Sequence, residues 1–176
     1  MQFTKDTFYV ALRDRLAALN PARTILLNGS VRPAIVVAEN ELVIPVRPQP
    51  ECFYIEWGAV QPVPQQQGER MVLGLECLIS YHTFGTGESG VDRGRSLAAL
   101  DTELLAISQP GAAPKRDYSQ TPPVDLGTSI VWSAPQFGKI AGSEAARNEA
   151  LPRGSSGVRL ERTASLRVFF FAESSS

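Results

Sequence analysis

The chain has 176 residues, of which 43% are hydrophobic and 20% charged, and its formal net charge is −1. A chain of this length favours a single domain and can bury a core without disulfides or bound metals. The near-neutral charge argues against a general nucleic-acid-binding protein, which needs a clear excess of Lys and Arg on its surface. We therefore expect one globular domain over residues 1–176.

The two cysteines, Cys52 and Cys77, both lie in apolar runs. Two cysteines do not make the disulfide framework of a small secreted domain, so we expect two buried free thiols. The N-terminus, MQFTKDTFYVALRDRL, carries acids and lacks the apolar core of a signal peptide. No stretch approaches the roughly 20 apolar residues of a membrane-spanning helix. These features favour a soluble protein.

Apolar residues recur every third or fourth position through residues 4–19, which predicts an amphipathic helix. Two short β-rich runs follow, at 24–27 and 34–38, on either side of the turn signal Asn28-Gly29. We expect the loop between these runs to be longer than that of a two-residue hairpin. The alternating run CFYIEWG then predicts a further strand.

The two longest strands are predicted at residues 71–84 and 158–171, where apolar and polar side chains alternate. A second amphipathic helix is predicted at 92–107. Such alternation is typical of antiparallel strands with one packed face and one wet face. Because strands outnumber helices, we predict an α+β fold with a mostly antiparallel sheet and both helices packed on one face.

Two long loops are predicted, at about residues 108–126 and 134–157, on either side of a short strand with the sequence TSIVWSA. Both loops are rich in Ala, Gly, Pro and Ser. Loops beyond about 12–15 residues are uncommon in compact domains and are usually functional or disordered. We interpret them as arms that order against a neighbouring subunit, with plain surface loops as the alternative. The serine tail at 174–176 is expected to be disordered.

A G-x-G-x-x-G pattern at Gly85, Gly87 and Gly90 lies between the long strand and the second helix. This spacing belongs to the dinucleotide-binding fingerprint, which also requires a short parallel strand before it and a second parallel strand after the helix. Here the preceding strand is long and alternating, and Val91-Asp92 separates the glycines from the helix. We expect a flexible glycine corner (residues 85–90) that uses glycine at positive φ and binds no dinucleotide.

His82, the only histidine, falls on the polar face near the end of the long strand. A lone histidine can act as a general base, but no Ser or Asp stands at the spacing of a catalytic pair, and no second histidine could complete a metal site. We therefore expect no catalytic residue, no cofactor and no metal. The alternative is a small-molecule-binding or enzymatic α+β domain with a pocket between Tyr81, His82 and the glycine corner.

The order of these elements resembles that of a known protein family. The segments that carry the resemblance are, in chain order, FYVALRDRLAAL, TILLNG, RPAIVVAEN, MVLGLECLISYHTFG, DRGRSLAALDTELLAI and TASLRVFFFAE. In this order they resemble the tail terminator and minor tail proteins of long-tailed bacteriophages. The two long loops and the ECFYIEWG strand depart from that pattern, so the tail or connector component remains open.

The resemblance implies a structural protein rather than an enzyme. It implies a small α+β subunit that forms a ring, often a hexamer, at the end of the tail tube, where it stops tube growth. The implied partners are further copies of the chain, the tail-tube protein and the head-connector proteins. No membrane is implied, and DNA passes through the lumen only as cargo. The implied location is the virion tail, and the host cytoplasm during assembly.

Three cations on the second long loop, Lys139, Arg147 and Arg153, are the candidates for contacts with a neighbouring subunit or with the lumen. Exposed charge pairs contribute only about 0–1 kcal/mol each, so apolar contacts must supply most of the affinity. A bacterial protein with another assembly function is the third alternative.

Overall fold

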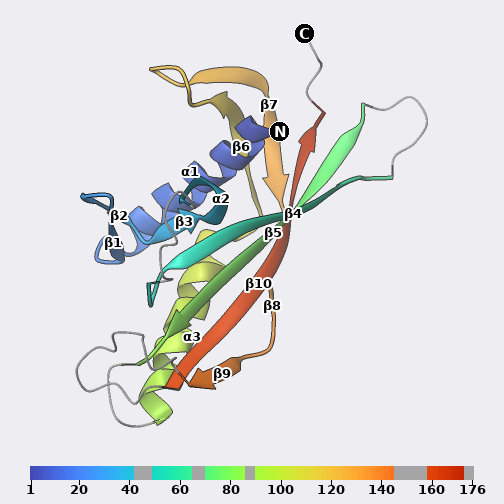
Figure 1. Cartoon of the computed structure of the whole chain (residues 1–176). Coiled ribbons are helices and arrows are strands. Elements are labelled where there is room, and N and C mark those ends of the chain that lie inside the picture. Colours follow the sequence, from blue (N-terminus) through green and yellow to red (C-terminus); the bar gives the residue numbers. More distant parts are fainter. Residues whose placement is uncertain (42–48, 65–69, 86–89, 145–157, 173–176) are drawn as a thin grey trace.

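The computed structural model describes residues 1–41, 49–64, 70–85, 90–144 and 158–172. Figure 1 shows a strongly twisted sheet with two long helices beside it. These helices are α1 (Gln2–Leu19) and α3 (Gly90–Ile107), and a single helical turn, α2 (Ala38–Glu41), lies between them in the sequence. The helices predicted at 4–19 and 92–107 are confirmed, and each begins two residues earlier than expected.

The main sheet has the strand order β3-β4-β5-β10-β7-β6, and β8 and β9 also pair with β10. β3 pairs with β4 in parallel, and the other pairings among the described strands are antiparallel. The α+β class is therefore confirmed, with a mixed sheet. The strands are β1 (Thr24–Leu27), β2 (Ser30–Pro33), β3 (Ile35–Val37), β4 (Phe53–Pro62), β5 (Val72–Thr83), β6 (Gly111–Asp117), β7 (Val124–Trp132), β8 (Gln136–Phe137), β9 (Ala141–Glu144) and β10 (Val158–Phe171).

The centre of the sheet is the long antiparallel pair of β5 and β10. The two strands have 12 and 14 residues, and they are the longest described, as the alternating pattern predicted. Their register places Cys77 opposite Leu166 and Leu75 opposite Val168, all four buried. One face of this pair is therefore apolar along its length.

Side chains from both long helices meet that apolar face in one core. Phe8 of α1 packs edge-on against two indole rings, with centroid separations of 5.9 Å to Trp57 and 5.4 Å to Trp132. Both cysteines are buried free thiols, as predicted. The largest fully buried members of the core are Phe8, Leu12, Leu16, Ile35, Phe53, Ile55, Leu75, Ile79, Tyr81, Leu97, Leu100 and Leu104.

The loop predicted at 108–126 is wrong over most of its length. β6 and the first three residues of β7 lie there, and the two strands form an antiparallel hairpin. The sequence GAAPKRD has little strand propensity, but β6 is the last strand of the sheet, where Pro114 can lack its N–H. Tertiary contact fixes the strand, because the backbone N–H of Arg116 donates to Oγ1 of Thr7 on α1 at 3.1 Å.

The second predicted loop, at 134–157, is wrong in its first part. β8 and β9 lie there, and both add to β10. These strands are two and four residues long, too short to show a pattern of their own. The rest of this loop, 145–157, and the tail at 174–176 lie outside the described residues.

A tight hairpin joins β1 to β2 and forms a separate two-stranded sheet. Leu27 pairs with Ser30, so the loop holds only Asn28 and Gly29, with φ of 49° and 77°. Positive φ at both central residues is typical of the type I′ turn, which Asn-Gly favours. The expectation of a longer loop is therefore wrong, because β2 begins directly after the turn.

Candidate functional site

The β1–β2 hairpin carries the two most exposed large hydrophobic side chains in the described part of the chain. Leu26 is 62% exposed and Val31 is 69% exposed. These two residues are cross-strand partners, so their side chains lie next to each other on one face of the hairpin. We call this pair, with the Asn28-Gly29 turn that it flanks, the hairpin tip. Single exposed hydrophobic residues are ordinary, whereas two that lie side by side make the hairpin tip a candidate interaction surface.

The hairpin exposes these residues because its other face is buried. Ile25 and Leu27 alternate with Leu26 and point into a second, smaller core. The members of that core are Ile25, Leu27, Ala34, Val36 and Cys52, with Tyr54 packed against them. The hairpin is therefore held against the sheet on one side and open on the other.

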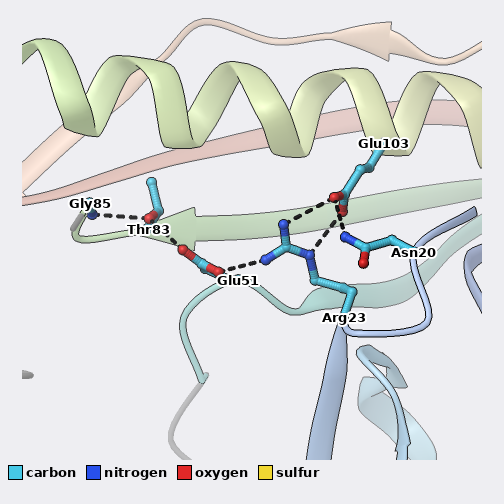
Figure 2. A network of polar contacts seen from close by, with 6 residues as sticks. All are labelled: Asn20, Arg23, Glu51, Thr83, Gly85 and Glu103. Carbon is cyan, nitrogen blue, oxygen red and sulfur yellow. Dashed lines mark hydrogen bonds and ion pairs between the residues drawn. The ribbon is translucent and has the colours of Figure 1, made fainter.

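An anchoring network of polar residues holds the base of the hairpin (Figure 2). Arg23, the residue before β1, donates from Nε to Oε2 of Glu103 at 2.9 Å and from Nη1 to Oε2 of Glu51 at 2.5 Å. Asn20, at the end of α1, donates from Nδ2 to Oε1 of Glu103 at 2.7 Å. Arg23 also accepts a backbone hydrogen bond from Ala34, which closes the hairpin at 3.0 Å. The network thus ties the hairpin base to both long helices.

The same network continues to the glycine corner. The hydroxyl of Thr83 donates to Oε1 of Glu51 at 3.4 Å, and the N–H of Gly85 donates to that hydroxyl oxygen at 3.0 Å. Burial of Arg23 disfavours its charge, but the hydrogen bond and charge of Glu103, with the charge of Glu51, outweigh burial and raise the pKa of the guanidinium. Arg23 therefore stays charged at all working pH values.

The glycine corner has the backbone conformation that the sequence predicted at its first glycine. Gly85 has φ of 73°, and a Cβ there would lie 2.6 Å from Cγ of Arg93. Gly87 lies outside the described residues. Gly90 is the first residue of α3, so the expectation that Val91-Asp92 separates the glycines from the helix is wrong. β5 is antiparallel to both neighbouring strands, unlike the parallel strand of a dinucleotide-binding unit.

Tyr81 and His82 are neighbours on β5, so their side chains point to opposite faces of that strand. The Tyr81 hydroxyl donates to Asp101 of α3, to which Arg162 also donates, from Nη1 at 2.6 Å. Burial, together with Asp101, raises the pKa of Tyr81. His82 is only 5% exposed, and its ring meets Phe84 edge-on at 5.6 Å. The expectation that His82 lies on a wet face is therefore wrong, because its face of β5 is covered at this end of the strand.

A second apolar surface lies where β7 and β10 part. The two strands pair only at Val168–Trp132 and Phe169–Val131, and beyond this point they diverge. The opening is a groove of about 500 Å³, which we call the outer groove. Its walls are formed by Arg70, Val72, Gly127, Thr128, Ser129, Val131, Phe169, Phe170 and Phe171.

Side-chain alternation along β10 makes the outer groove apolar. Phe170 is 3% exposed and belongs to the core, so Phe169 and Phe171 point away from it. Val131, on the facing strand, is 46% exposed. The lining also holds polar groups from Arg70, Thr128 and Ser129, and Oγ1 of Thr128 is buried without a hydrogen-bond partner among the described residues. A buried hydroxyl of this kind is costly unless a further group satisfies it.

Of the three cations predicted to make subunit contacts, only Lys139 is described. It is exposed between β8 and β9. Arg147 and Arg153 lie outside the described residues. Over the described ranges, no three His, Cys, Asp or Glu side chains are grouped closely enough to hold a metal ion. In the same ranges no helix is both long and apolar enough to cross a membrane.

No protein-family model matches the chain, and no curated protein matches it either.

The sequence holds one signal from which the exposed pair at the hairpin tip could have been predicted. Asn-Gly between Leu27 and Ser30 is the strongest short hairpin signal, and pairing outward from it makes Leu26 and Val31 neighbours. The anchoring network has no comparable signal, since Arg23 and Glu103 are 80 residues apart.

Proposed function

We propose that the chain is a structural subunit of a phage or prophage tail, a tail-terminator-like protein that forms a ring at the end of the tail tube. The observation that carries this proposal is the presence of two unlike apolar surfaces, the hairpin tip and the outer groove. In Figure 1 the β1–β2 hairpin and the region where β7 meets β10 are well apart. A closed ring needs two different surfaces on each copy, because every subunit contacts the next through a heterologous interface.

The projecting ends of β4 and β5 give further support. Figure 1 shows them extending away from the helices. Val60 is 37% exposed and Met71 is 58% exposed, so this extension presents apolar side chains. A protein with a net charge of −1 has little self-repulsion to oppose assembly. Extended apolar structure of this kind suits contact with a neighbouring subunit or with the tube.

In this proposal the chain acts by assembly and not by catalysis. Its partners are further copies in a ring, such as a hexamer, together with the tail-tube and head-connector proteins. The antiparallel centre of the sheet, with the helices on one face, is the body of the subunit. Lys139, Arg147 and Arg153 remain the candidates for polar contacts at the joint or in the lumen, where DNA passes.

The proposal is tested by adding the purified chain to assembling tail tubes and measuring both tube binding and solution mass. We expect a ring oligomer, formed either free or on the tube, and tubes that stop growing. A chain that stays monomeric and also fails to bind any tail-tube protein would refute the proposal.

A further inference from the structure

We infer that the hairpin tip of one copy docks in the outer groove of the next copy. The inference rests on the proposed function, because it names the contact that joins neighbouring subunits. It assigns the main apolar contact to the β1–β2 hairpin and to the opening between β7 and β10.

The hairpin tip has the properties of a preformed apolar knob. Leu26 and Val31 project side by side, and the segment between them, LNGS, carries no charge. The type I′ turn fixes the backbone, and the anchoring network at Arg23 fixes the hairpin base. A knob that is already ordered loses little conformational entropy when it binds.

The outer groove has the complementary properties. Phe169, Phe171 and Val131 offer an apolar lining for two aliphatic side chains. The Arg70 guanidinium lies over the Phe171 ring, 5.2 Å from its centroid, so this cation already has a contact at the rim.

A second copy of the chain is the occupant that these observations favour. The tip and the groove lie apart on one molecule, so head-to-tail contact buries both on every copy of a ring, with no end left exposed. No charged side chain of the tip opposes Arg70 at the groove. A stable interface buries roughly 800 Å² per partner, more than one hairpin tip supplies. The projecting ends of β4 and β5, where Val60 and Met71 are exposed, would supply the rest of the buried area.

The first test compares two substitutions of the same kind in the full chain. Val31→Asp places a charge on the hairpin tip, and Val91→Asp places one at the start of α3, where valine is 60% exposed. We expect Val31→Asp to weaken self-association at least tenfold and Val91→Asp to leave it unchanged, with both variants keeping the wild-type circular dichroism. If wild type assembles and both variants assemble equally well, the inference is overturned while the proposed function stands.

The second test identifies the occupant by disulfide trapping between two differently labelled populations, one carrying Val31→Cys and the other Ser129→Cys. The native thiols do not interfere, because Cys52 and Cys77 are both buried. We expect mixed disulfides between the two populations and none within either population alone. Disulfides that form only between copies of the same variant would assign the tip another partner. The same holds if Val31→Asp loses tail-tube binding but still self-associates. A wild-type chain that never assembles, alone or on tubes, would remove the proposed function itself.

Discussion

At the scale of single residues, Arg23 has the most consequential position. It stands between the end of α1 and the start of β1, and its side chain is 15% exposed while that of Glu103 is 16% exposed. Glu51, the third member, is 42% exposed, so water screens that ion pair more strongly. The pair with Glu103 therefore supplies most of the anchoring, and Arg23 sets how the hairpin sits against the rest of the protein.

We predict that Arg23→Ala lowers the free energy of unfolding by about 2–3 kcal/mol, because it leaves the half-buried Glu103 without its cation. The control is Arg13→Ala, which removes an exposed pair with Asp14 and a contact with the Tyr9 ring, and it should cost less than about 1 kcal/mol. Urea unfolding of the two variants measures the difference. Equal losses would show that the network does not stabilise the fold.

The two buried thiols predict a decline in stability at alkaline pH. Burial raises the pKa of Cys52 from 9.0 to about 12 and also raises that of Cys77. Above about pH 9 the unfolded chain loses these protons while the folded chain keeps them. The contribution of the two thiols to the free energy of unfolding is therefore complete below pH 9. It is lost as the pH rises toward the pKa values of the folded state. We expect a loss of about 1–3 kcal/mol between pH 8 and pH 10, measured by urea unfolding.

The control for this pH prediction is the double variant Cys52→Ala/Cys77→Val. It lacks both thiols, so its unfolding free energy should fall less steeply over the same pH interval, whatever its absolute stability. Identical slopes in the variant and the wild type would show that other groups cause the alkaline loss.

At the scale of elements, the corner between β5 and α3 depends on glycine at one position and not at another. Gly85 has φ of 73° and lies against Arg93, whereas Gly94 lies inside α3, where a Cβ would have no contact within 4 Å. Glycine is required at position 85 because the φ angle is positive and Arg93 leaves no room for a Cβ. Position 94 has no such requirement, and a glycine in a helix is a liability.

We predict opposite effects of the same substitution at these two sites. Gly85→Ala should lower the melting temperature, at a cost of about 1–3 kcal/mol. Gly94→Ala should raise it, with a gain of about 0.5–1 kcal/mol from better helix propensity. Calorimetry on both variants tests the pair. A stabilising Gly85→Ala would contradict the positive φ and the close approach of Arg93 at this corner.

Elements with a pattern of their own could be predicted from the sequence, and elements formed by their partners could not. The helices α1 and α3 and the strands β5 and β10 are long enough to show a complete period. β6 has no such pattern, since GAAPKRD becomes a strand by pairing with β7 and contacting Thr7. The exposed pair at the hairpin tip follows from the Asn-Gly turn, whereas the outer groove depends on how β7 and β10 diverge, which no local pattern encodes.

At the scale of the whole molecule, the hairpin tip and the outer groove lie on separate parts of the surface. The edge of the sheet at β6 is in contact with α1, and the opposite edge ends in the three-residue strand β3. Under the proposed function, the hairpin tip and the outer groove would join identical copies in a closed assembly.

Native mass spectrometry of the full chain, with negative-stain imaging of the same sample, is the most direct test of ring formation. We predict closed rings of one defined size, free or on tail tubes, whose mass is a whole multiple of 19.1 kDa. A chain that is monomeric at every concentration and in the presence of tail tubes, with no ring in any image, would contradict the account.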